Sequence, residues 1–151
     1  MSEHEANSSG ERIDVVRALM RAWSAHDVEG VLALVSDDVI WHYAVGLPPC
    51  LGKAAMGEFL TGLAGHQQEL AWRLTNHAET NDRVLVEGVD DYVNPAGHRV
   101  QVPYMGAYDF DGDTITGWRD YVDMRTMRAA EKGGGVPEHL VALVEAGEPL
   151  S

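Results

Sequence analysis

The chain has little of what several classes of protein require. Its one cysteine, Cys50, cannot form an internal disulfide, so the fold needs no oxidising compartment. No run of about 18 apolar residues is present, which excludes a membrane-spanning helix from the sequence pattern. Only 11 Lys and Arg stand against 24 Asp and Glu, which gives a net charge of −13. That charge argues against binding to nucleic acid or to anionic membrane surfaces.

The composition that remains is that of a soluble globular protein. A length of 151 residues with 45% hydrophobic side chains suits one domain with a sizeable core. Residues 1–10 are polar and lack the apolar segment of a signal peptide, so we expect a disordered leader and a cytoplasmic protein. The seven histidines are scattered singly, without the spacing of metal ligands, and no metal is expected.

Three helices are predicted in the first half of the chain. Residues 11–25 carry apolar side chains at steps of three and four, which indicates an amphipathic helix. Asp27 can cap a second helix over residues 28–34. After the Pro48-Pro49 loop, a third helix follows Gly52 and ends near Gly65.

Strands dominate the second half. Residues 39–45 form one candidate strand, and turn residues separate four more over 69–77, 83–92, 98–110 and 114–123. Helices followed by a run of strands are typical of an α+β domain, here with three helices lying across one strongly bent antiparallel sheet. Beyond residue 128, a Gly-rich break precedes a short apolar helix over 137–146. We expect that helix to dock on the mouth of its own barrel or on a second subunit.

The strand over residues 114–123 carries a carboxylate among aromatic residues. Because side chains alternate along a strand, Trp118, Asp120 and Val122 share one face. If that face is buried, Asp120 points into an apolar interior, where a charge needs a partner or a purpose. The alternative is that Asp120 faces solvent beside a paired Arg119.

The strand over residues 83–92 offers a second carboxylate. Alternation sends Asp90 and Asp91 to opposite faces, and Asp90 shares the face of Gly88 and Tyr92. Taken alone, such a pair is typical of solvated surface. On the concave face of a bent sheet, however, Asp90 and Asp120 would share one apolar pocket. Like charges there push one pKa up, which supplies an acid and a base near neutral pH.

These features resemble a known family. The Leu47-Pro48-Pro49 loop followed by Gly52 and a helix, the Val89-Asp90 strand, and above all residues 115–121 (ITGWRDY) resemble limonene-1,2-epoxide hydrolase. More broadly, residues 11–128 resemble the nuclear transport factor 2-like superfamily, which includes SnoaL-like polyketide cyclases and ketosteroid isomerases. The resemblance implies a cone-shaped α+β barrel with a deep apolar pocket, a homodimer packed through the sheet, and no cofactor.

The resemblance also implies residue roles. In the hydrolase family, an Asp on the Trp-Arg-Asp strand activates water with the help of a Tyr and an Asn, a second Asp protonates the epoxide, and an Arg bridges the two acids. On this chain Asp120 would be the base and Asp90 the acid, whereas Gly88 stands at the position of the bridging Arg. One register of residues 39–45 places Trp41 and Tyr43 at the water-holding positions, and a slip by one places His42 and Ala44 there.

The catalytic candidates are therefore Asp120, Asp90, Tyr43 and His42. The substrate-binding candidates are Trp41, Tyr92, Val102, Tyr104, Trp118, Val122, Met20 and Trp23. Each aromatic residue could equally be a core residue with a satisfied polar tip, and His42 a half-buried hydrogen-bonded histidine.

Three functions fit this pattern. The first is hydrolysis of an epoxide-like apolar substrate by both aspartates. The second is a SnoaL-like cyclase or isomerase in which one buried carboxylate moves a proton beside a carbonyl. The third is a non-catalytic domain that binds a small hydrophobic ligand or dimerises.

Overall fold

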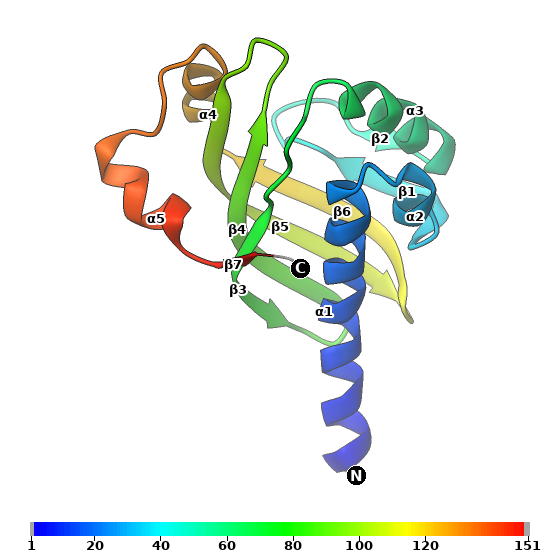
Figure 1. Ribbon diagram of the computed structural model, residues 1–151. Helices are drawn as coiled ribbons and strands as arrows, with labels where there is room; N and C mark the ends of the chain where they lie inside the picture. The colour runs from blue at the N-terminus through cyan, green and yellow to red at the C-terminus, as the bar shows by residue number, and fades with distance from the viewer. Residues whose placement is uncertain (1, 150–151) are drawn as a thin grey trace.

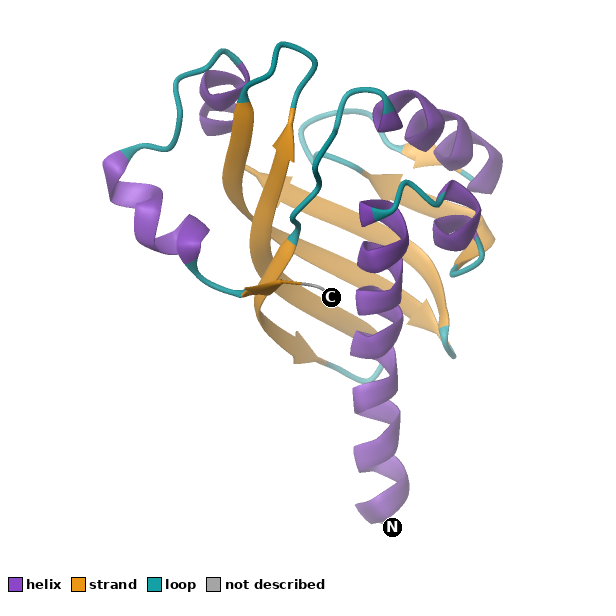
Figure 2. Ribbon diagram, viewed as in Figure 1, coloured by secondary structure: helices purple, strands orange, loops and turns teal. Residues whose placement is uncertain are grey.

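Seven strands form one curved, open sheet in the order β2-β1-β6-β5-β4-β3-β7. The computed structural model describes residues 2–149, and side chains from residue 12 to residue 147. The strands are β1 Val35–His42, β2 Cys50–Leu51, β3 Arg73–Glu79, β4 Arg83–Val93, β5 Arg99–Asp111, β6 Thr114–Val122 and β7 Glu148–Pro149. All neighbouring strands run antiparallel except β1 and β6, which are parallel. The predicted α+β class with a bent, mostly antiparallel sheet is confirmed (Figures 1 and 2).

Helices cover the concave face of this sheet. They are α1 Ser2–Ser24, α2 Val28–Leu32, α3 Lys53–Ala64 and α4 Met124–Glu131. After these four helices the chain forms a 3-10 turn, η1 Glu138–Leu140, and the short helix α5 Val141–Glu145, which docks on Arg73 of β3. Figure 1 shows α1 crossing the sheet, with α2 and α3 beside its C-terminal end. None of the helices within residues 2–149 is long and apolar enough to cross a membrane.

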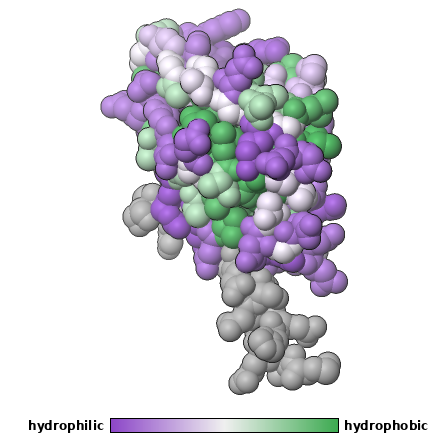
Figure 3. All heavy atoms as spheres, turned by 90° about the vertical axis from the view of Figure 1, so that its right-hand side faces the viewer, coloured by the Kyte–Doolittle hydropathy of each residue, from purple (hydrophilic) through white to green (hydrophobic). Residues whose placement is uncertain are grey.

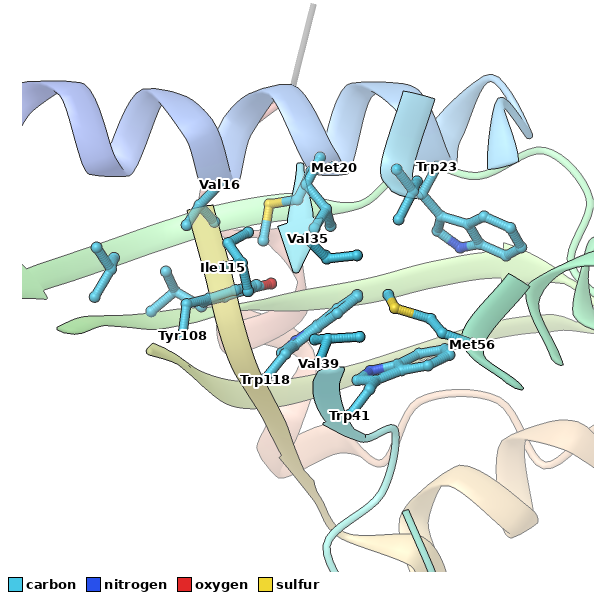
Figure 4. Close-up of a cluster of buried hydrophobic side chains, with 14 of the residues drawn as sticks. Val16, Met20, Trp23, Val35, Val39, Trp41, Met56, Tyr108, Ile115 and Trp118 are labelled. Atoms are coloured by element: carbon cyan, nitrogen blue, oxygen red, sulfur yellow. The ribbon is translucent and has the colours of Figure 1, made fainter. Parts of the chain in front are cut away.

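The core lies between α1 and the sheet (Figure 4). The three-and-four spacing of α1 turns Val16, Leu19 and Met20 toward the strands, and all three are fully buried. Burying each such side chain stabilises the fold by roughly 1.5–3 kcal/mol. From the sheet, Tyr108 and Trp118 meet this helix face, and Trp118 stacks on Trp41 with 4.9 Å between ring centroids.

The structure decides the register of the early strand. β1 begins at Val35, four residues before the predicted start, because buried Val35 pairs with Ile115 of β6. The predicted turn at residues 36–38 therefore lies within the strand, at a pairing irregularity between Val35 and Ile40. Trp41 points into the core with 3% of its surface exposed, so His42 lies on the opposite face of β1.

Both ends of the chain differ from the sequence-based boundaries. Helix α1 begins at Ser2, within the segment predicted as a leader. Helix α4 was not predicted; it follows β6 directly, and the Asp123 side chain caps it by accepting hydrogen bonds from the backbone of Arg125 and Thr126. The helix predicted over residues 137–146 is divided into η1 and α5.

The C-terminal segment docks on its own sheet. Strand β7 pairs with β3, and Arg73 of β3 donates a hydrogen bond to the carbonyl of Val144 on α5. Val144 is buried there, whereas Leu143 is half exposed.

Hydrophobic side chains also reach the surface. On the side where α2 and α3 lie, Figure 3 shows hydrophobic residues gathered in the middle of the face and hydrophilic residues around them.

Candidate functional site

A cavity of about 490 Å³ opens between the concave face of the sheet and helices α3 and α4. Its walls are mainly aromatic and aliphatic, and its polar groups are few. The lining residues are Trp23, Val31, Trp41, Tyr43, Ala44, Leu47, Phe59, Leu60, Leu63, His66, Gln67, Leu70, Trp72, Asp90, Asp91, Tyr92, Asn94, Pro95, Trp118, Asp120, Val122, Met124, Met127 and Glu131. An apolar cavity of this size with a few convergent polar groups is typical of a small-molecule site.

Strand pairing brings Asp90 and Asp120 into this cavity. Asp90 of β4 pairs with Val102 of β5, and Asp120 of β6 pairs with Gly106, four residues further along β5. Positions four apart on a strand share a face, so both carboxyl groups lie on the concave face. Both side chains are half-buried and both line the cavity.

Burial makes these two groups weak acids. Desolvation, with a contribution from the neighbouring Asp91 charge, raises the pKa of Asp90 to about 7. Desolvation and the Asp90 charge raise the pKa of Asp120 well above its ordinary value. Since two like charges in one apolar cavity repel each other, the pair holds on to a proton near neutral pH.

Trp118 distinguishes the two acids. Its Nε1–H donates to Asp120 Oδ1 at 2.8 Å and so lowers the pKa of Asp120, opposing the effect of burial. Within the described part of the chain, Asp90 accepts no comparable hydrogen bond, and Asp91 adds a repulsive charge beside it. The hydrogen bond from Trp118 thus favours the charged form of Asp120, whereas burial and the Asp90 charge, which have the larger effects, favour its protonated form.

A glycine makes room for the Asp120 carboxyl group. A Cβ at Gly106 would lie 3.0 Å from Asp120 Oδ1 and 3.2 Å from a methyl group of Val86. An alanine at this position would require the carboxyl group to shift by a few tenths of an ångström.

Two buried tyrosines, Tyr104 and Tyr108, lie near the acid pair but do not line the cavity. Burial, together with the charges of Asp90 and Asp120, raises the pKa of Tyr104 and of Tyr108 well above the ordinary value. Both phenols therefore stay protonated. Neither hydroxyl has a hydrogen-bond partner among the described residues, and the same holds for the indole nitrogens of Trp41 and Trp72.

The predicted site residues divide into two groups. Besides the two aspartates, the cavity is lined by Trp23, Trp41, Tyr43, Tyr92, Trp118 and Val122. Four others do not line it. Met20 is a fully buried core residue of α1, and Val102 is fully buried as the cross-strand partner of Asp90. Tyr104 is buried with its hydroxyl enclosed, and His42 lies on the other face of β1.

The place of the family's bridging arginine is occupied by an aromatic ring. A Cβ on Gly88 would lie 2.3 Å from the carbonyl oxygen of Arg73 and 2.9 Å from Cε1 of Tyr104. Tyr104 is the cross-strand partner of Gly88. No side chain therefore fits at position 88 beside this tyrosine, and an arginine there would require the β3–β4 edge to move.

Asp91 has a structural role. It is 2% exposed and pairs with Arg73 Nη1 and Arg99 Nη2, each at 2.6 Å, and it accepts a hydrogen bond from Gln101 at 3.0 Å. Because Arg73 also binds the Val144 carbonyl, this cluster fastens α5 to the sheet.

Sequence reasoning missed the residues of α4 and of the loop before β3. Met124, Met127 and Glu131 of α4 line the cavity, as does Trp72. The signal for α4 was present, since Asp123 is a good N-cap that precedes residues with high helix propensity. No group of three or more His, Cys, Asp or Glu side chains with the geometry of a metal site occurs within the described chain.

The fold and this site define an α+β domain with an acid-containing apolar cavity. The SnoaL-like domain family matches residues 16–118, more than half of the chain, and the protein belongs to that family. The expected membership of the broader nuclear transport factor 2-like superfamily is thereby confirmed.

Solved structures agree with this assignment. An LEH-like epoxide hydrolase from M. tuberculosis is 28% identical, with 90% of this chain and 96% of that chain covered and a TM-score of 0.72. SalBIII, an epoxide hydrolase/cyclase-like enzyme of salinomycin pyran ring formation, is 17% identical over 78% and 95% of the two chains, with a TM-score of 0.71. A protein of ketosteroid isomerase-like fold from Catenulispora acidiphila, in complex with trimethylamine, is 18% identical over 82% and 93%, with a TM-score of 0.71.

Proposed function

We propose that the protein is a cofactor-independent acid–base enzyme that hydrolyses an epoxide on a small hydrophobic molecule. The observation that supports this most is the pair of carboxyl groups, Asp90 and Asp120, which come from different strands and share one apolar cavity. The likeness to the LEH-like epoxide hydrolase adds to it.

The proposed reaction needs one proton donor and one acceptor. Asp120, ionised and held by Trp118, takes a proton from water as the water oxygen attacks an epoxide carbon. The carbon–oxygen bond breaks, and the departing oxygen takes the proton of Asp90. The product is a diol. Transfer of the proton from Asp120 back to Asp90, directly or through water, restores the starting state.

Tyr43 has the position to orient the reactants. It lines the cavity, and its ring stacks on Phe59 with a centroid distance of 4.2 Å. Trp41 contacts both rings edge-on, at 5.8 Å from Tyr43 and 5.4 Å from Phe59. This aromatic wall fixes Tyr43 beside the cavity, where its hydroxyl can bind water or substrate.

A second function is favoured by Gly88. Without the bridging arginine, one carboxylate can still move a proton next to a carbonyl, as in a SnoaL-like cyclase or isomerase. Asp120 would then be the only essential acid–base group. A purely structural domain fits less well, because the cavity is not filled by side chains and Asp120 forms no ion pair with a described residue.

Isosteric variants separate these functions. With a panel of terpene epoxides and β-keto compounds, Asp120→Asn should lower turnover by about 10²-fold or more. Asp90→Asn should lower epoxide hydrolysis similarly but leave most of an isomerase or cyclase rate. Asp113→Asn, in the exposed turn before β6, is the matched control. Turnover that survives Asp120→Asn would contradict both catalytic functions.

A further inference from the structure

The charged residues that line the cavity are acidic. None of its described lining residues is Lys or Arg, and its one basic side chain is His66, whose Nδ1 lies 3.0 Å from the carbonyl oxygen of Gly62. Four acidic residues, Asp90, Asp91, Asp120 and Glu131, are among those that line the same cavity. A ligand that enters it meets hydrogen-bond acceptors and negative charge, but no arginine or lysine.

Not all four carboxyl groups are free to bind a ligand. The Asp91 charge is balanced by Arg73 and Arg99, and Arg99 also lies 3.9 Å from Glu69. Asp90 and Asp120 share a proton and are the proposed reacting groups. Glu131 is the remaining carboxylate, and no ion pair joins it to another residue between 12 and 147.

Glu131 is held firmly in place. Its side-chain Oε1 accepts a hydrogen bond from the Tyr92 hydroxyl at 3.2 Å. Its backbone carbonyl accepts a hydrogen bond from Asn94 Nδ2 at 2.8 Å and lies 2.9 Å from His98 Nδ1. These contacts fix the last turn of α4 against the end of β4, and the Tyr92 hydroxyl holds the carboxylate beside it. Tyr92 also connects it to the acid pair, because the charges of both Glu131 and Asp90 raise the pKa of Tyr92.

The apolar surroundings of these carboxylates are suited to a cation. Aromatic faces attract ammonium groups, and the attraction is stronger when water is excluded. Tyr92, Trp41, Trp72 and Trp118 all line the cavity, and Met124 and Met127 of α4 complete the wall next to Glu131. An ammonium group placed here would meet a carboxylate and aromatic rings together.

We propose that the cavity selects organic cations: its ligand is a hydrophobic molecule that carries an ammonium group bound by Glu131. This rests on the proposed function only in that the same cavity binds the substrate. The apolar body then fills the space along the aromatic wall, and the reacting group lies at Asp90 and Asp120. Anionic molecules of the same shape are excluded by the same charges.

Three aromatic probes of similar size test the charge preference in the unmodified protein. They are benzyltrimethylammonium, its uncharged isostere neopentylbenzene, and the anion 4-tert-butylbenzoate. Isothermal titration calorimetry, or displacement of a fluorescent dye from the cavity, gives the affinities. We expect the cation to bind at least about tenfold more tightly than the neutral isostere, which is about 1.4 kcal/mol, and the anion to bind most weakly. Equal or tighter binding of the neutral isostere overturns the proposal.

Variants locate the preference. Glu131→Gln should remove most of the advantage of the cation over the neutral isostere. The control Glu138→Gln removes one acidic charge at an exposed position on η1 and should leave the preference unchanged. Circular dichroism checks folding, and the comparison of probes in the unmodified protein decides the matter if Glu131→Gln does not fold. A preference that persists in folded Glu131→Gln also overturns the assignment.

The cation-binding proposal and the catalytic proposal can be refuted independently of each other. Asp120→Asn should keep the preference for the cation even though it loses turnover. If the probes show no charge preference while Asp120→Asn is inactive, the catalytic proposal stands and the cation site does not. If the cation is preferred and no tested substrate is turned over, the reverse holds.

Discussion

Trp118 donates its indole hydrogen to Asp120, two residues further along the same face of β6, at 2.8 Å. The indole itself is fixed by stacking on Trp41 at 4.9 Å and on Tyr108 at 5.3 Å. A rigid aromatic layer thus orients a carboxyl group whose environment otherwise disfavours ionisation. Trp118 acts through Asp120 and is a positioning residue as well as a part of the cavity wall.

Trp118→Phe keeps the aromatic layer but removes this hydrogen bond. Because the bond lowers the pKa of Asp120, its loss should raise that pKa, and the acidic limb of the kcat/KM profile should move to higher pH by about one unit. Trp41→Phe is the control, since the Trp41 nitrogen has no partner among the described residues. A profile that moves equally in both variants would show that the hydrogen bond is not the cause.

Asp90 should make stability depend on pH. Its pKa of about 7 in the folded protein lies above the value of 3.8 expected for an unfolded chain. The folded state therefore binds this proton more tightly, and the stability it contributes is complete below about pH 4 and is lost as the pH rises to about 7. At about 1.4 kcal/mol per pH unit, the loss is roughly 4 kcal/mol at most.

Asp90→Asn removes that titration. The free energy of unfolding of the variant, measured in urea, should rise relative to the unmodified protein between pH 4 and pH 7 and then stay level. Asp113→Asn, in an exposed turn, should give a constant difference over the same range. A constant difference for Asp90→Asn as well would mean that Asp90 is not buried as the structure describes.

Gly106→Ala should harm catalysis more than folding. The added methyl group would lie 3.0 Å from Asp120 Oδ1 and would displace the carboxyl group. The carboxyl group must move by a few tenths of an ångström; since a displacement of about 1 Å can cost up to about 10²-fold in rate, we expect kcat to fall by about threefold. Gly62→Ala is the matched control, because nothing lies within 4 Å of a Cβ at that exposed helical position. There the substitution should stabilise the protein by about 0.5–1 kcal/mol with turnover unchanged.

A homodimer through the convex face of the sheet remains an expectation. Leu85, Met105 and Tyr121, on adjacent strands β4, β5 and β6, are 38%, 51% and 50% exposed and line a shallow groove. Met105→Asp should convert a dimer to a monomer in light scattering after size-exclusion chromatography. Leu51→Asp, at an exposed apolar position on β2, should not. If neither or both of them change the mass, this face is not the interface.

The sequence by itself determined the class of fold and singled out Asp90 and Asp120 as candidate acids, without deciding whether either was buried. Periodicity identified α1 and the four long strands, since a buried face repeats every 3.6 residues in a helix and every two in a strand. Alternation identified the residues that share a face with each acid, Gly88 and Tyr92 for Asp90 and Trp118 and Val122 for Asp120. Helical periodicity and strand alternation depend only on residues close together in the chain, so the sequence alone can reveal them.

Only the tertiary structure decided the rest. The register of β1, which turns Trp41 inward and His42 away, depends on pairing with β6. The ring of Tyr104 over Gly88 and the closure of the cavity by α4, with Glu131 at its wall, depend on contacts between segments distant in sequence. The raised pKa values follow from burial, which is a property of the assembled fold. A side chain's face can be read from its neighbours in the chain, but its desolvation and its partners are set by everything that packs around it.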